Sequence, residues 1–194
     1  MPKVVAIIQA RLTSQRFPAK ILADLDGQPI LAWVLQRARE IRGVDAVALA
    51  MPGVTARAES DVLGRFLDVA RAYRADVIMR LTADCPLLDR FVAEQVLELY
   101  RSRSCDFASN DTLISGFPDG WDVEVFSRAA LETAAANATE PHDREHVTSW
   151  MRRTLRCQTL YAQGQWTGPK LSIDTPEDLE TVRAWLHDQR RKTA

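Results

Sequence analysis

The chain has 194 residues, of which 46% are hydrophobic and 26% are charged, and its formal net charge at pH 7 is −1. This is the composition of a soluble globular protein that is long enough to bury a substantial core. The near-zero charge argues against broad electrostatic binding of nucleic acid or of an acidic membrane, because both need a large surplus of lysine and arginine.

The cysteines and the first residues bear on the cellular compartment. Cys85, Cys105 and Cys157 are odd in number and widely spaced, so they form neither a disulfide framework nor a zinc-binding pattern. The apolar run Val4–Ile8 is too short for a signal peptide or a membrane span. We therefore expect a cytoplasmic protein without a membrane segment.

Short runs rich in valine, isoleucine and leucine alternate with helical patterns along the chain. We expect strands at 3–9, 45–51, 76–81, 105–109, 121–126, 155–161 and 170–173. Apolar stripes at helical spacing fall within 30–41, 62–70, 91–99 and 179–186. This alternation predicts an α/β fold, with a mostly parallel central sheet and helices on both faces. We expect a single domain over residues 1–189 and a frayed polar tail at 190–194.

The loop after the first strand is rich in cations. Arg11, Arg16 and Lys20 precede the first acidic residue, Asp24, and the hydroxyl of Ser14 lies between them. A cationic loop at the carboxyl end of a buried strand is how an open α/β sheet builds a phosphate site, where arginine binds phosphoryl oxygens through two parallel hydrogen bonds. The alternative is an ordinary solvated loop.

Three acidic segments accompany that loop. Asp84 follows a predicted strand and precedes a turn at Pro86; Asp119, Asp122 and Glu124 lie in one short segment, and Asp174 precedes the last helix. Two carboxylates from separate strand ends suit Mg²⁺, which usually takes one or two carboxylates besides water and phosphate oxygens. The alternatives are a turn-forming aspartate at position 84 and a strand-end residue at position 174.

The last helix has a clear predicted start. Thr175 is a favourable N-cap residue, Pro176 suits the first helical position, and Asp178 can complete a capping box. Asp174 is therefore expected where a strand ends and the helix begins.

Six segments in this order make the chain resemble the cytidylyltransferases that activate acidic sugars. That family comprises the acylneuraminate and 3-deoxy-manno-octulosonate enzymes, and the chain is most similar to its spore-coat-polysaccharide type. The segments are Ile8–Lys20, Asp61–Phe66, Arg80–Asp89, Phe117–Phe126, Asp143–Thr148 and Asp174–Leu179.

The resemblance implies a Rossmann-like nucleotide-diphospho-sugar transferase fold and Mg²⁺-dependent transfer of a cytidylyl group from CTP to a sugar or acidic sugar, with release of pyrophosphate. It implies that the protein is a homodimer and that its product is used in the biosynthesis of surface polysaccharides. It also implies roles for individual residues. The nucleotide would be held by Ala10, Arg11, Ser14, Arg16 and Lys20, the metal by Asp84 and Asp174, and the acceptor by Asp119, Asp122, Glu124, Arg144 and His146, with Arg11, Lys20 and Asp84 taking part in catalysis.

The chain departs from the family's pattern after Met51. Only residues 52–59 separate the second predicted strand from the segment that begins at Ser60, where relatives place a further helix and strand. A degenerate homologue that binds nucleotide without turnover is therefore one alternative. A glycosyltransferase of related fold is another, disfavoured because Asp84 is followed by Cys85 and Pro86 rather than by an Asp-x-Asp motif. A third is a sugar-1-phosphate nucleotidyltransferase, disfavoured because no glycine precedes Gly27.

His142 and His146 are four residues apart, a spacing at which two histidines on one helix face can bind zinc. The sequence offers no evident third ligand, so a zinc site is disfavoured.

Overall fold

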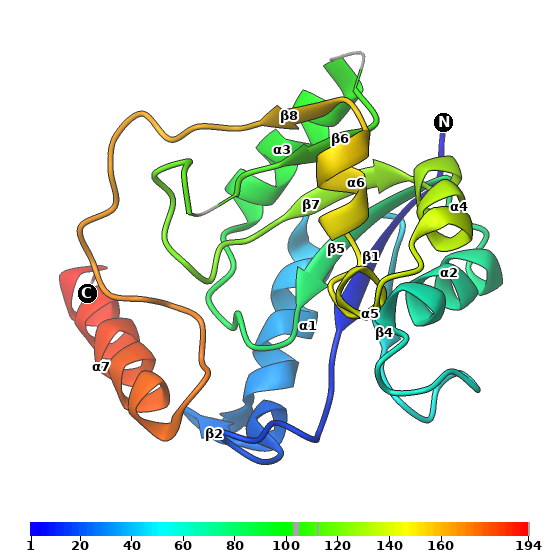
Figure 1. Ribbon diagram of the computed structural model, residues 1–194. Coiled ribbons are helices and arrows are strands. Elements are labelled where there is room, and N and C mark those ends of the chain that lie inside the picture. The colour runs from blue at the N-terminus through cyan, green and yellow to red at the C-terminus, as the bar shows by residue number, and fades with distance from the viewer. Residues whose placement is uncertain (103–104, 112, 194) are drawn as a thin grey trace.

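The computed structural model describes residues 1–102, 105–111 and 113–193 (Figure 1). Its core is a six-stranded sheet in the order β4-β1-β5-β7-β6-β8. The strands are β1 (Val4–Gln9), β4 (Ala46–Ala50), β5 (Val77–Thr82), β6 (Phe107–Ser109), β7 (Glu124–Ser127) and β8 (Cys157–Thr159). β1 is parallel to β4 and β5, and β6 is parallel to β8, whereas β7 runs antiparallel to its neighbours β5 and β6.

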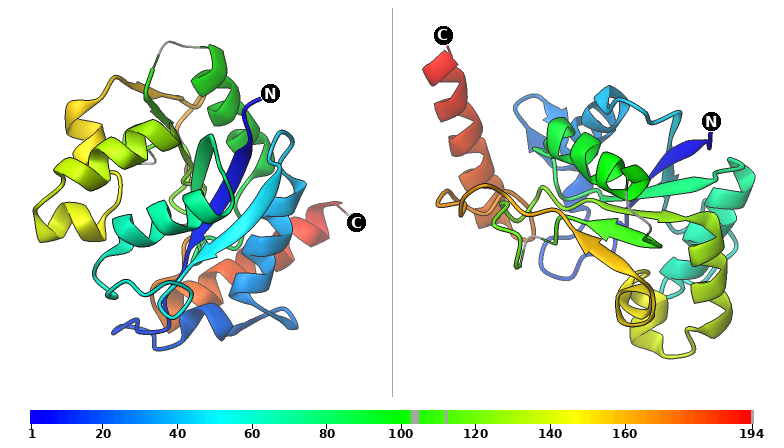
Figure 2. Two further views of the ribbon diagram at one scale, coloured as in Figure 1. Left: turned by 90° about the vertical axis from the view of Figure 1, so that its right-hand side faces the viewer. Right: turned by 90° about the horizontal axis from the view of Figure 1, so that it is seen from above.

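Helices cover both faces of the sheet, which confirms the predicted α/β class (Figure 2). They are α1 (Ile30–Glu40), α2 (Val62–Ala72), α3 (Arg90–Ser102), α4 (Arg128–Asn137), α5 (Pro141–Glu145), α6 (Ser149–Thr154) and α7 (Pro176–Thr193). Side chains alternate along β1, so Val5 and Ile7 pack toward α2 and α4 while Ala6 and Ile8 pack toward α1 and α3. The apolar run at the start of the chain is buried for this reason.

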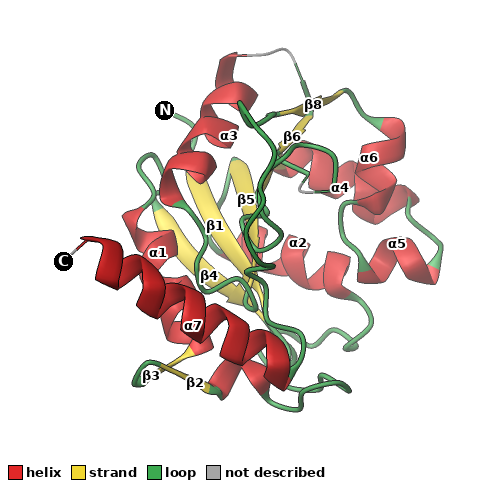
Figure 3. Cartoon of the chain, turned by 90° about the vertical axis from the view of Figure 1, so that its left-hand side faces the viewer, coloured by secondary structure: helices red, strands yellow, loops and turns green. Residues whose placement is uncertain are grey.

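Figure 3 shows α7 in front of α1 and near the small hairpin of β2 (Asp24–Leu25) and β3 (Gln28–Pro29). A third apolar cluster joins residues of these elements. The hairpin turns through Asp26 and Gly27, which both have positive φ. Leu171 and Ile173, from the segment that precedes α7, are fully buried in this cluster. That packing fixes the chain just before Asp174.

The strand predicted at 170–173 does not form. The backbone N–H of Leu171 donates to the carbonyl of Asp119 at 2.8 Å, and that of Ile173 donates to the carbonyl of Asp84 at 2.8 Å. These partners lie in loops rather than in a neighbouring strand, so the segment is extended and pinned without joining the sheet. The short apolar run suggested a strand, although it reflects burial of Leu171 and Ile173 under α7.

Two further features concern the ends of elements. α7 continues through the expected polar tail to Thr193, and Arg190 in this stretch forms an ion pair with Asp26 at 2.5 Å; Ala194 lies outside the described residues. Between β4 and α2, residues 51–61 form no helix or strand apart from an isolated bridge between Pro52 and Thr55. β4 is consequently an edge strand. No helix within the described ranges is long and apolar enough to cross a membrane.

Candidate active site

Two adjoining cavities open at the carboxyl ends of β1 and β5. The larger, of about 880 Å³, is lined by the loop after β1, by Thr82–Asp84, and by Glu59, Ser60, Glu145 and Asp174. The second, of about 500 Å³, lies over β7 and the loop that carries Asp119 and Asp122. Thr82, Asp84 and Asp174 line both cavities. The carboxylates of Asp84 and Asp174 therefore stand at the boundary between two binding spaces.

Lys20 is the centre of this boundary. The turn at Ala19, which has a φ of 54°, leads into a 3-10 helix (Lys20–Leu22) that directs the Lys20 side chain inward, where it is buried. Its Nζ donates to Asp84 Oδ2 at 2.8 Å, to Asp174 Oδ1 at 3.0 Å and to the carbonyl of Ile173 at 2.8 Å. These three acceptors match the three N–H groups of an ammonium. Lys20 would have to give up one of these three hydrogen bonds in order to donate to a phosphate oxygen.

Asp174 is held by cations on both oxygens. Oδ1 accepts from Lys20 and lies 3.0 Å from Arg16 Nη2, and Oδ2 accepts from Lys170 Nζ at 2.8 Å. Partial burial would raise the pKa of Asp174, but the hydrogen bonds and charges of Lys170 and Lys20 outweigh it and lower the pKa to about 2. The group is therefore an anion throughout the neutral range.

The donor set at this boundary fits Mg²⁺. Two carboxylates from different loops already converge on one cation, the ammonium of Lys20. Within the described ranges, no group of three or more His, Cys, Asp or Glu side chains is arranged to hold a metal ion. A pair of carboxylates without further protein ligands suits Mg²⁺, which keeps water and substrate oxygens in its shell, better than Zn²⁺.

The residues predicted to bind nucleotide lie together. Ala10, Arg11, Ser14 and Arg16 all line the larger cavity with Lys20. The loop that carries them is closed by a bond from the N–H of Ala19 to the carbonyl of Leu12 at 2.9 Å and by a hydrogen bond from Thr13 to Glu59. Arg11 and Arg16 are more than half exposed, and their partners are Glu145, at 3.6 Å, and Asp174. Such exposed pairs are weak, so both guanidinium groups can turn to an anionic ligand.

The second cavity is mostly acidic. Asp119 accepts a hydrogen bond from Ser172 Oγ at 2.6 Å, and Asp122 accepts one from the backbone N–H of Gly120 at 3.1 Å. Both carboxylates line the cavity. Its two cationic side chains, Arg80 and Arg152, are already bound to protein groups.

Glu124 is the partner of those two arginines. It accepts from Arg80 Nη1, from Arg152 Nη2 at 2.7 Å and from Thr148 Oγ1 at 2.9 Å, and it is 5% exposed. Burial alone would raise the pKa of Glu124, but the charges of Arg80 and Arg152 lower it. Glu124 lines the cavity, but its carboxylate oxygens already accept hydrogen bonds from protein donors. In this structure it therefore acts as a buried counter-ion to Arg80 and Arg152.

Arg144 and His146 do not line either cavity. The guanidinium of Arg144 donates to Asp61, at 2.5 and 2.9 Å, and to the carbonyl of Ala135 at 2.9 Å, which fixes α5 against α2 and α4. The His146 ring packs on that of His142, with centroids 4.3 Å apart. The expectation that these two residues face an acceptor is therefore not supported by their positions; their neighbour Glu145 reaches the larger cavity instead.

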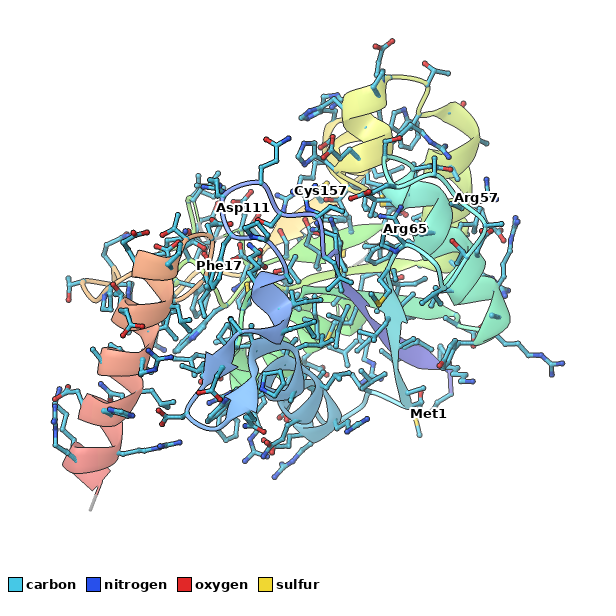
Figure 4. All side chains as sticks on the ribbon, turned by 90° about the horizontal axis from the view of Figure 1, so that it is seen from below. Met1, Phe17, Arg57, Arg65, Asp111 and Cys157 are labelled. Carbon is cyan, nitrogen blue, oxygen red and sulfur yellow. The ribbon has the colours of Figure 1, made fainter. Side chains whose placement is uncertain are left out.

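Sequence reasoning did not identify Arg65 or Lys170. Arg65, labelled in Figure 4, is 1% exposed, and its Nη1 donates to the carbonyls of Ala58 and Glu59, both at 2.7 Å. It thereby anchors the short 58–60 segment at the wall of the larger cavity. Lys170 contacts Asp174 and Asp178, and because residues 170–175 are not helical, no local spacing rule could have indicated this interaction.

Fold and site together describe an α/β protein with a pair of carboxylates between two adjoining cavities at the carboxyl ends of the sheet strands. A sequence model of the cytidylyltransferase family matches residues 5–51 and 53–191, nearly the whole chain. The chain belongs to the cytidylyltransferase family, a family of nucleotidyltransferase enzymes.

The similar proteins include enzymes and solved structures. The chain is 30% identical over 221 residues to a 3-deoxy-manno-octulosonate cytidylyltransferase of Anaeromyxobacter sp. strain Fw109-5, covering 100% of this chain and 88% of that one. It is 29% identical over 211 residues to the spore coat polysaccharide biosynthesis protein SpsF of Bacillus subtilis strain 168, covering 95% and 86%. A cytidylyltransferase structure from Leptospira borgpetersenii superposes with a TM-score of 0.88 at 26% identity, covering 97% and 88%.

Proposed function

We propose that the protein transfers a cytidylyl group from CTP to a sugar or acidic sugar of surface polysaccharide biosynthesis, with Mg²⁺ as cofactor and pyrophosphate as the second product. The observation that carries this proposal is the convergence of Asp84 and Asp174 between a cationic loop and a second cavity. Relatives named as cytidylyltransferases support the donor and the reaction class.

The triphosphate would occupy the larger cavity. Arg11 and Arg16 would leave their exposed acidic partners and bind phosphoryl oxygens, since a guanidinium binds phosphate through two parallel hydrogen bonds. The Ser14 hydroxyl, whose oxygen accepts from the N–H of Phe17 at 3.3 Å, keeps its own proton for a phosphate oxygen. Burial of Lys20 suits a role in holding the carboxylates rather than in first contact with the nucleotide.

Asp84 and Asp174 would hold Mg²⁺, which when bound neutralises phosphate charge and favours ionisation of an attacking hydroxyl. The pKa of Asp174, lowered to about 2, keeps that ligand ionised without any proton loss on binding. An in-line displacement needs no covalent enzyme intermediate. Cys85 beside Asp84 is buried, and burial raises the pKa of its thiol, so it is unsuited to nucleophilic attack.

The acceptor would occupy the second cavity. Asp119 and Asp122 offer carboxylate oxygens to the hydroxyl groups of a sugar. Arg80 and Arg152 are both bound to Glu124, and Arg152 is also bound to Asp111. An acceptor carboxylate would therefore bind at the end of the cavity that is lined by Asp84 and Asp174, where a bound metal ion would supply positive charge. Acidic sugars of the 3-deoxy-manno-octulosonate and acylneuraminate type satisfy this arrangement.

The test is release of pyrophosphate from CTP, UTP, ATP and GTP with Mg²⁺ and a panel of acceptors containing 3-deoxy-manno-octulosonate, an acylneuraminate and neutral sugars. We expect CTP-selective release that requires an acceptor. Asp84→Asn should reduce it at least about 100-fold, because even outer partners of metal ligands contribute 10- to 100-fold. No release with any acceptor, despite a rise in melting temperature with CTP, would favour the alternative of a nucleotide-binding homologue without turnover. Wild-type rates in Asp84→Asn would remove Asp84 from the reaction.

A further inference from the structure

Lys170 contacts the carboxylate of Asp174 from the side that faces away from the cavities. Its Nζ lies 2.8 Å from Asp174 Oδ2 and 3.1 Å from Asp178 Oδ2. Lys170 lines neither the larger nor the second cavity, whereas Asp174 lines both. Oδ1, the other oxygen of Asp174, accepts from Lys20 and lies near Arg16, which are both lining residues of the larger cavity. The two oxygens of Asp174 thus have different surroundings.

The backbone on either side of this contact is fixed. Leu171 and Ile173 are buried and hydrogen-bonded to the loops that carry Asp119 and Asp84. After Asp174, the Asp178 carboxylate accepts from the N–H groups of Asp174, at 2.8 Å, and Thr175, at 3.0 Å, while Thr175 Oγ1 accepts from the N–H of Asp178 at 3.3 Å. With both flanks held, the orientation of the Asp174 carboxylate depends on the partners of its oxygens.

The partners of the two Asp174 oxygens differ in whether a bound ligand would compete with them. Arg16 is 67% exposed and faces the larger cavity, where a triphosphate would compete for it, and Lys20 lies where a cation shared by Asp84 and Asp174 would be held. Lys170 has no such competitor, since neither cavity reaches it.

We propose that Lys170 is a positioning residue: it holds Asp174 Oδ2 so that Oδ1 is presented, beside Asp84, to a divalent cation. This inference rests on the proposed function, because it assigns Asp174 to the metal. Outer partners that orient metal-binding carboxylates typically contribute 10- to 100-fold to metal affinity or activity. Lys170 is distinguished from an ordinary surface ion pair by its second acceptor, Asp178, and by the fixed backbone around it.

The experiment compares the wild type with Lys170→Met, Lys170→Arg and the control Lys192→Met. Lys192 also pairs with an aspartate of α7, Asp188, but on the exposed surface. Mn²⁺ binding is measured by electron paramagnetic resonance in the presence of CTP, and the Mg²⁺ concentration for half-maximal pyrophosphate release is measured beside the KM for CTP at saturating Mg²⁺. Melting temperatures identify any general loss of structure.

We expect Lys170→Met to weaken Mn²⁺ binding and raise the Mg²⁺ requirement by about 10- to 100-fold, with little change in the KM for CTP. Lys170→Arg, which keeps a charged donor, should recover most of the affinity, and Lys192→Met should match the wild type. If Lys170→Met melts too low for study, Lys170→Gln, which keeps a neutral donor, gives the same comparison.

Three outcomes would contradict the positioning role of Lys170 or the metal site on which it depends. Equal Mn²⁺ affinity in Lys170→Met and the wild type overturns the positioning role of Lys170. An equal loss in Lys170→Met and Lys170→Arg also overturns it, because a simple packing defect would then suffice. A wild type that binds no Mn²⁺, or binds it as well after Asp84→Asn, overturns the metal site itself and thus the proposed function.

Discussion

At the scale of single residues, Lys20 shows how a long-range contact changes the meaning of a motif. Its carboxylate partners lie 64 and 154 residues further along the chain. The local sequence predicts that Lys20 lies with Arg11 and Arg16 in a cationic loop; in the structure all three line the larger cavity, but only Lys20 is buried. No local pattern could indicate that its ammonium would be enclosed by Asp84, Asp174 and the carbonyl of Ile173.

Lys20→Met should therefore affect stability more than nucleotide affinity. Removal of the ammonium leaves two carboxylates close together without their shared cation, and like charges at short distance repel. We expect a lower melting temperature than in the wild type, together with a larger stabilisation by Mg²⁺, measured by thermal unfolding over a Mg²⁺ titration. Lys3→Met, which alters an exposed lysine bound to the carbonyl of Tyr73, is the control. The same response to Mg²⁺ in Lys20→Met and the wild type would contradict this interpretation.

Glu124→Gln should destabilise the protein by about 3 kcal/mol at neutral pH, because it leaves the guanidinium of Arg80 without its charged partner and removes one of the two carboxylates, beside Asp111, that bind Arg152. The folded-state pKa of Glu124 lies below its ordinary value of 4.5. The ionic contribution is thus fully present above the unfolded-state pKa and disappears as the pH falls through the folded-state pKa. The difference in the free energy of unfolding between wild type and variant should narrow below about pH 4.5.

Urea unfolding at a series of pH values measures that difference. Glu132→Gln is the matched control, since Glu132 makes an exposed pair with Arg71 at 3.5 Å and should contribute less than about 1 kcal/mol. A difference between Glu124→Gln and the wild type that stays constant down to acid pH would show that the charge of Glu124 is not the source of its contribution.

At the scale of elements, regular segments with a continuous local pattern were predictable. The stripes at 30–41, 62–70 and 91–99 became α1, α2 and α3, and the first, second and third predicted strands became β1, β4 and β5. The capping box of Thr175 and Asp178 formed as expected. The strand predicted at 170–173 does not form, because a short apolar run indicates which side chains are buried and not whether a neighbouring strand is present.

Gly120→Ala should dislodge the segment that precedes α7. Gly120 has a φ of +107°, and a Cβ at this position would lie 2.5 Å from the carbonyl carbon of Leu171 and from the nitrogen of Ser172. We expect a loss of about 2 kcal/mol in the free energy of unfolding and a marked loss of pyrophosphate release, because the backbone that places Asp174 must move.

The control for that substitution is Gly27→Ala. Gly27 also has a positive φ, of +86°, but no atom lies within 4 Å of the place that an added methyl group would take. It should therefore incur only the backbone strain, about 1 kcal/mol, and leave pyrophosphate release unchanged. Equal effects of the two substitutions on release would show that the contact between Gly120 and the 171–172 backbone does not position the site.

At the scale of the whole molecule, the connection between β4 and α2 is short and irregular. The alignment with the Anaeromyxobacter relative is 221 residues long, which exceeds the 194 residues of this chain, so the relative carries additional residues. Residues 51–61 add no strand, and β4 ends the sheet. The spacing in the sequence indicated that this connection is short, whereas Arg65, which anchors the loop, was missed because its burial depends on tertiary contacts.

We expect the protein to form a homodimer. Leu113, Ile114 and Tyr161 are exposed apolar side chains on two loops that are joined by a bond from the N–H of Ala162 to the carbonyl of Ser115, and clustered apolar surface is typical of an interface. Light scattering should give about twice the chain mass of 21.8 kDa, and Ile114→Asp should reduce it to one chain mass. A single chain mass for the wild type at micromolar concentration would contradict the expectation.

Asp178 ends the first turn of α7 and also holds Lys170. The same carboxylate thus caps the start of α7 and binds the lysine that holds Asp174. We therefore expect unwinding of the first turn of α7 to release the Asp174 side chain as well. Linkage between the two is reciprocal. A ligand that immobilises Asp174 should slow amide hydrogen exchange in the first turn of α7, and the C-terminal helix would report on the occupancy of a site that it does not itself line.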